Sequence, residues 1–274
     1  MALPFIPSDA ALLALQAAVV AAPRQVPRIA PLQRLRSRAW ALVPFASIVV
    51  VIFAIRYVSD TATGLTYLAL IAVPPLAAAA LGWAARGAKP IFAPVALVLF
   101  VIAWTSRTSL AGEAAAALLS ALSCVTLGVL IAAVTPPAWL KLGIIAMAAA
   151  DSWLVINDLL QAPNATLIAA HPGGGLPRLQ TEIFGSVSMG YGDLFVAALL
   201  GAVLASDRRV QQRAALLTLA IAACFDLLFL VVDELPATVP VALALIVVEA
   251  LARLRPSVAR RRSTPAAATP RRAT

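Results

Sequence analysis

The chain has 274 residues, of which 62% are hydrophobic and 12% charged, and its formal net charge is +9. The mean hydropathy is +0.95. A soluble domain with a single core does not reach these values, so the composition predicts an all-α polytopic membrane protein. Membrane topology explains the positive charge, and we expect a lipid bilayer rather than nucleic acid as the partner of the basic residues.

Apolar segments along the chain are long enough for the roughly 20 helical residues that cross about 30 Å of hydrocarbon. A further apolar run at 11–22 is short for a span and lacks the basic flank of a signal peptide, so a ninth helix there stays open. The sequence therefore predicts eight or nine transmembrane helices, the eight clearer ones at 39–58, 64–84, 90–105, 110–135, 138–160, 188–206, 212–233 and 236–253.

Basic residues fall mainly on one side of these helices. Of the 21 Lys and Arg residues, 18 lie on the side that holds the C-terminus, which the positive-inside rule assigns to the cytoplasm. We therefore expect a multi-pass protein of the bacterial cytoplasmic membrane with a cytoplasmic C-terminus. The expected parts are an N-terminal segment and basic linker (1–38), N-terminal transmembrane helices (39–135), transmembrane helices with the candidate site (136–253) and a disordered basic tail (254–274).

The metal-binding residue types are sparse and scattered. Cys124 and Cys224 both lie in predicted helices, where a small apolar side chain packs well. His171 lies in a loop without a second His or a Cys to complete a metal shell. The sequence predicts no metal site, no disulfide and no cofactor.

Three aspartates lie deep within predicted helices, where a carboxylate costs at least about 2.5–3.5 kcal/mol. They are Asp151, Asp193 and Asp226. Asp151 and Asp193 belong to consecutive, antiparallel helices and are expected at similar depth near the exterior side. Two facing carboxyls at low dielectric cannot both ionise, so such a pair supplies an acid and a base together.

Two further motifs accompany the pair. Asp193 ends the sequence "GYGD", in which Gly190 and Gly192 allow close approach of a partner helix or of an extended substrate. The last predicted helix opens with Pro236 and Pro240, which hinder a regular helix start. The segment "LPRLQTEIFGSVS" ahead of GYGD alternates apolar and polar stretches and is a candidate short strand for pairing with substrate.

The ordered set of Asp151, "GYGD" and "PVAL" resembles the GxGD intramembrane aspartyl proteases, the presenilin and signal peptide peptidase family. The short loop between the two aspartates is more similar to signal peptide peptidase. The resemblance implies a nine-helix fold and peptide-bond hydrolysis in transmembrane segments or signal peptides. It covers roughly residues 140–250. It assigns catalysis to Asp151 and Asp193, and active-site support and substrate binding to Gly190, Tyr191, Gly192, Pro240, Val241, Ala242 and Leu243.

The chain departs from the family pattern at two positions. Ala150 stands where the family usually has Tyr before the first aspartate, and Val241 interrupts the Pro-Ala-Leu motif, for which "PAT" at 236–238 is a competing alignment. Three other functions remain open. They are a prepilin-peptidase-like enzyme, a proton- or cation-coupled transporter that uses Asp193 and Asp226, and a membrane protein without chemistry.

Overall fold

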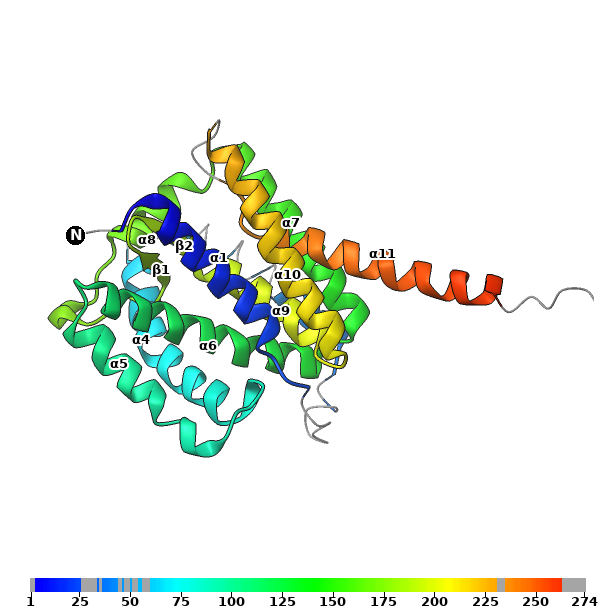
Figure 1. Cartoon of the computed structure of the whole chain (residues 1–274). Helices are drawn as coiled ribbons and strands as arrows, with labels where there is room; N and C mark the ends of the chain where they lie inside the picture. The colour runs from blue at the N-terminus through cyan, green and yellow to red at the C-terminus, as the bar shows by residue number, and fades with distance from the viewer. Residues whose placement is uncertain are drawn as a thin grey trace, which may run out of the picture.

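The computed structural model describes residues 3–25, 34, 36–43, 46, 50, 54–55, 60–230 and 235–262, and these are mostly helical. One short antiparallel hairpin interrupts the helices among them (Figure 1). The elements are α1 (Phe5–Ala21), α4 (Thr61–Ala79), α5 (Val95–Thr105), α6 (Leu110–Val134), α7 (Pro137–Ile156), α8 (Gln161–Ala169), β1 (Thr181–Phe184), β2 (Val187–Gly190), α9 (Tyr191–Leu204), α10 (Arg208–Phe225) and α11 (Val239–Arg262).

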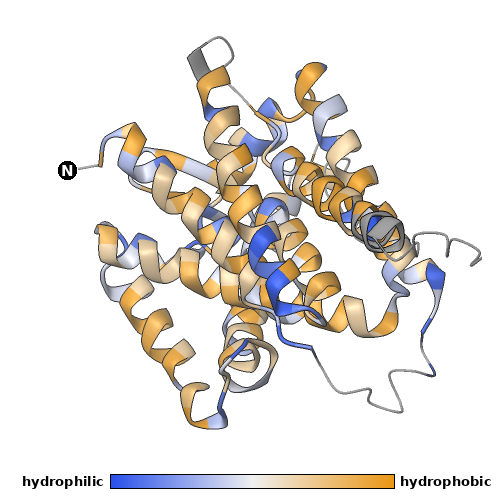
Figure 2. Cartoon of the chain, turned by 45° about the vertical axis from the view of Figure 1, so that its right-hand side comes forward, coloured by the Kyte–Doolittle hydropathy of each residue, from blue (hydrophilic) through white to orange (hydrophobic). Residues whose placement is uncertain are grey.

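Each predicted span that falls within the described residues contains a helix, while the span at 39–58 lies largely outside them. Hydrophobic residues cover most of the helical ribbon (Figure 2). Among the described residues four helices are long and apolar enough to cross a membrane, namely Thr61–Ala84, Leu110–Val134, Pro137–Ile156 and Arg208–Leu228. Three apolar helices are shorter, Phe5–Ala21, Pro90–Thr105 and Tyr191–Leu204.

Two segments differ from the expected boundaries. The run at 11–22 forms α1, which begins earlier, directly after Pro4. The region expected as a disordered tail from 254 begins as helix, because α11 continues to Arg262 through a stretch rich in Ala, Leu and Arg, all strong helix formers. The remainder of that tail, 263–274, lies outside the described residues, as does most of the basic linker.

Helix α9 is the central element of the core. Its buried residues include Leu194, Val196–Leu200 and Leu204, and it packs against α6, α1, α7 and α11. Two glycines allow the backbones of α6 and α1 to approach α9 closely. A Cβ on Gly128 of α6 would lie 2.8 Å from the carbonyl carbon and oxygen of Ala198, and one on Gly201 of α9 would lie 2.2 Å from the carbonyl oxygen of Val20. Small residues at these crossings therefore set the spacing of α1, α6 and α9.

The described contacts also fix helix directions. Helices α6 and α9 run the same way, because Ser123 contacts Tyr191 and Gly128 contacts Ala198. Helices α7 and α11 run in opposite directions. Lys141 near the start of α7 pairs with Glu249 far along α11, whereas Asp151, late in α7, contacts Thr238 just before α11 begins.

The hairpin β1–β2 forms immediately ahead of α9, in the segment predicted as a strand. Its turn is Gly185–Ser186, and Gly185 has φ of +62°, which a two-residue turn with glycine first requires. Two helices hold this turn from outside the hairpin. The carboxylate of Glu113 in α6 accepts the Gly185 N–H at 2.8 Å, and the hydroxyl of Ser8 in α1 accepts the Ser186 N–H at 3.3 Å.

Replacing Gly128 by Ala should destabilise the fold by about 1–3 kcal/mol, because the new methyl group would overlap the backbone of α9. Thermal unfolding in detergent micelles measures this change. Gly64→Ala is the matched control, since a Cβ there meets nothing within 4 Å and should be neutral or stabilise α4 by up to about 1 kcal/mol. Equal effects of the two substitutions would contradict the tight α6–α9 crossing.

Candidate active site

The three helices that carry the predicted site residues pack against one another. Helix α7 contacts α9, and α11 contacts both of them. Asp151 lies in the last third of α7, Asp193 in the first turn of α9, and Pro240 in the first turn of α11. Residues far apart in the sequence are thus brought onto three neighbouring elements.

Asp151 is joined to the segment that leads into α11. Its Oδ2 atom accepts a hydrogen bond from the Thr238 hydroxyl at 2.6 Å and one from the Thr238 N–H at 3.4 Å. The carbonyl of the preceding Ala237 accepts a bond from Gln16 of α1 at 3.0 Å. The non-helical backbone before α11 is therefore held between α1 and α7, with the carboxylate of Asp151 as one of its anchors.

The GYGD residues form the start of α9. Asp193 is the third residue of the helix, and its Oδ2 accepts the N–H of Gly190 at 3.1 Å, which closes a capping box. An N–H donor and a helix N-terminus both favour an ionised carboxylate. Gly190 and Gly192 are exposed, and a Cβ on Gly192 would meet nothing within 4 Å. The space beside this glycine is open, so partner-helix packing does not explain it.

Tyr191 points away from that open space and toward α6. Its hydroxyl lies 2.7 Å from that of Ser123, and the Cys124 thiol donates to its carbonyl at 3.8 Å. Ser123 and Cys124 are fully buried. Tyr191 therefore fixes the start of α9 to α6, and this holds the helix turn that carries Asp193 in place.

The PVAL residues lie mainly within the core. Pro240 is the second residue of α11, where a missing N–H is tolerated, and it is buried. Val241 and Ala242 are buried in the same hydrophobic cluster as Leu194, whereas Leu243 is exposed. The group that reaches a site carboxylate is Thr238 of the competing "PAT" segment.

A carboxyl group that the sequence reasoning missed is Glu182 of β1. It is 1% exposed, and neither of its oxygens has a hydrogen-bond partner. Burial raises the pKa of Glu182 to about 8, the negative charge of Asp193 adds to this rise, and the Ser120 hydroxyl beside it partly offsets it. The available signal was the strand period, which places Glu182 on the same face as the apolar Phe184.

Asp226 lies on a different part of the fold. It follows the last residue of α10, and its side chain interacts with that of Asp9 in α1. Helices α1 and α10 pack side by side. Asp9, the second residue that the sequence reasoning missed, lies outside the long apolar run at 11–22 that defined the expected helix.

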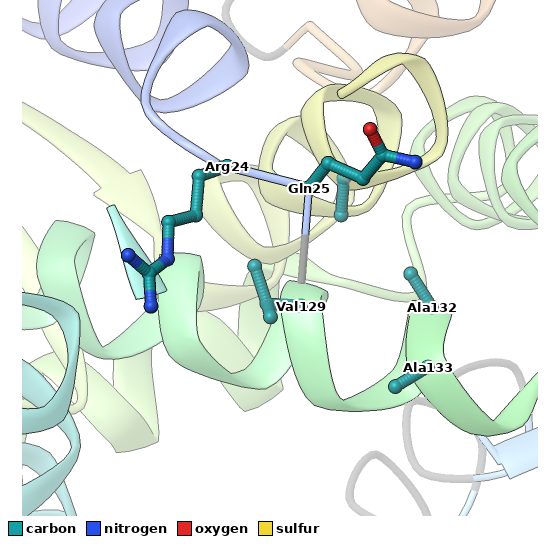
Figure 3. Close-up of a pocket in the computed structure, with 6 residues that line it drawn as sticks. Arg24, Gln25, Val129, Ala132 and Ala133 are labelled. Atoms are coloured by element: carbon teal, nitrogen blue, oxygen red, sulfur yellow. The ribbon is translucent and has the colours of Figure 1, made fainter. Parts of the chain in front are cut away.

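A cavity of about 120 Å³ lies at the other end of α9 from Asp193. It is lined by Arg24, Gln25, Val129, Ala132, Ala133 and Ala202. The side chains of Arg24 and Gln25 point in opposite directions and do not converge on one point (Figure 3). This cavity takes no part in the candidate site.

Comparisons of the chain with protein-family models, with curated proteins and with solved structures find no match. Among the described residues no group of three or more His, Cys, Asp or Glu side chains is arranged to hold a metal ion.

Thr238→Val should remove the hydroxyl donor to Asp151 while keeping the shape of the side chain. We expect a loss of stability of about 0.5–2 kcal/mol in thermal unfolding, whereas Thr238→Ser should retain most of it. A double-mutant cycle with Asp151→Asn tests the pairing directly. If the two substitutions simply add, the bond contributes nothing.

The stability of the protein should also depend on pH through Glu182. The unfolded carboxyl titrates near 4.5 and the folded one near 8, so folding takes up a proton between these values. The contribution of Glu182 to the free energy of unfolding is fully present below about pH 4.5. It is lost as pH rises toward about 8, by about 1.4 kcal/mol per pH unit. Unfolding of Glu182→Gln, followed over the same range, should lack this component.

Proposed function

We propose that the protein is an intramembrane aspartyl endopeptidase that hydrolyses peptide bonds in transmembrane segments or signal peptides. The observation that carries the proposal is the packing of α7, α9 and α11 against one another, with Asp151 bonded to the segment that opens α11. This arrangement unites the aspartate helix, the GxGD helix and the proline-led helix. The proposal includes eight or nine transmembrane spans. It also includes a relationship to the presenilin and signal peptide peptidase family, which the order of the motifs suggests.

The proposed chemistry needs one ionised and one protonated carboxyl. Asp193, with its N–H donor and its place in the first turn of α9, is suited to be the ionised member. It takes a proton from a water molecule as the water oxygen attacks the carbonyl carbon of the peptide. Asp151, as the protonated member, donates a hydrogen bond to the carbonyl oxygen. Asp193 then passes the proton that it took from water to the leaving amine as the C–N bond breaks.

Substrate access is supported by the exposed edge of the GYGD segment. A transmembrane helix must unwind before cleavage, and its freed backbone groups then need new partners. Strand addition beside β2 supplies such partners, because Ser188 and Gly190 are exposed while β1 faces α6. Gly192, with open space around its Cα, leaves room for an extended chain next to Asp193.

A proton- or cation-coupled transporter is the second candidate, and one observation favours it. Asp9 and Asp226 form a carboxyl pair on the apolar helices α1 and α10, which is a common arrangement for binding a proton. This pair is on different helices from α7 and α11. Transport through Asp226 would therefore use a path separate from the proposed protease site.

Cleavage of a single-span substrate by the purified protein in detergent should depend on both site aspartates. Asp151→Asn and Asp193→Asn remove the acid or the base, so each should lower the rate by about 10²–10⁴-fold. Asp226→Asn is the matched control, an aspartate of the same apolar bundle outside the site, and should retain cleavage. No cleavage by any form, together with proton flux in liposomes that requires Asp226, would replace the protease with the transporter.

A further inference from the structure

The inner face of the hairpin ahead of α9 carries a carboxyl group among mainly apolar side chains. Glu182 is paired across the strands with Met189, and the next inward pair is Phe184 with Val187. All three companions pack against the main hydrophobic cluster. Because side chains alternate along a strand, Glu182 shares the inner face of the hairpin with these apolar residues.

Among the described residues, no cationic side chain acts on the titration of this group. The groups that act on its titration are the Ser120 hydroxyl of α6, its own backbone and the Asp193 carboxylate of α9. Cys124 of α6 and Tyr191 of α9 are the other titratable groups that interact with it, and neither carries a positive charge. The Ser120 hydroxyl donates to the carbonyl of Leu179 at 3.2 Å, so its proton is directed elsewhere. A buried carboxylate without a cation or donors is strongly disfavoured, and the group keeps its proton instead.

Glu182 also lies next to the peptide that caps Asp193. Its cross-strand partner Met189 is followed directly by Gly190, whose N–H donates to the Asp193 carboxylate. The negative charge of Asp193 raises the pKa of Glu182. The coupling acts in both directions, because an ionised Glu182 would oppose ionisation of Asp193 equally.

We propose that Glu182 is a proton-bearing positioning residue. As a neutral acid it holds the inner face of the hairpin against α6 and leaves Asp193 as the charged carboxyl at the start of α9. Loss of its proton places a second negative charge beside Asp193 and a bare carboxylate in the apolar core. The added charge disfavours the ionised form of Asp193, and the buried carboxylate weakens the packing of the hairpin against α6. The activity part of this inference rests on the proposed function, while the protonation of Glu182 does not.

The first test is the pH profile of cleavage. In the wild type, cleavage should fall above about pH 8, approaching tenfold for each pH unit. Glu182→Gln cannot ionise and should keep its rate there, as should Glu182→Met, the second variant if the amide does not fold. Glu113→Gln is the matched control, because Glu113 also contacts the hairpin, and it should keep the wild-type profile. An identical alkaline fall in both Glu182 variants would overturn the positioning role.

The second test does not require activity. Infrared spectra of the protein in micelles should contain a C=O stretching band of a protonated carboxylic acid at neutral pH. One component of this band should be lost as pH passes about 8, and the same component should be missing in the difference spectrum between the wild type and Glu182→Gln, over any band from other protonated carboxyls such as Asp151. An unchanged spectrum in the variant would mean that Glu182 is ionised and would overturn the inference. The expected band with no cleavage by any form would support the proton on Glu182 and refute the protease.

Discussion

Backbone that leaves a helix inside an apolar protein needs polar partners, and this constraint organises the whole structure. The described chain departs from helix near its site at the hairpin and at the segment before α11. Polar side chains of neighbouring helices meet both departures. Glu113 and Ser8 bind the hairpin turn, and Gln16 and Asp151 bind the segment before α11. Two of these four partners, Glu113 and Asp151, are acids that satisfy backbone groups.

That structural use bears on how the aspartates are interpreted. Asp151 and Asp193 each accept a backbone N–H, so each has a place in the fold without any chemistry. Glu113 likewise accepts a backbone N–H, that of Gly185. What distinguishes Asp193 is the open space beside Gly192 together with the exposure of Ser188 and Gly190 in β2, since a purely structural cap needs neither. Glu182 differs from all of these because it binds no backbone group.

The sequence was informative where local pattern decides the outcome. Apolar runs located the helices, and alternation ahead of GYGD predicted a short strand where β1 forms, because both follow from side-chain periodicity. The pairing of β1 with β2 of the same chain was not predicted. The hydrogen-bond partner of each side chain depends on tertiary packing and could not be predicted from the sequence. Thr238, rather than Pro240, reaches Asp151 because it lies in the turn just before α11 begins, where its own N–H and hydroxyl are both free to donate. Glu182 was hidden because a four-residue strand gives too little sequence for its buried face to stand out.

The position of Asp226 limits how far transport and proteolysis can share this fold. Its partner Asp9 is on α1, the helix that also donates to Ala237 through Gln16 and accepts from the hairpin turn through Ser8. A change in charge at the Asp9–Asp226 pair therefore acts on a helix that touches both backbone departures of the candidate site. A structural role for the pair is consistent with that connection, and it requires no ion path through α7, α9 and α11. The half-buried Asp9–Asp226 pair is thus compatible with a protease, because α1 packs against both regions.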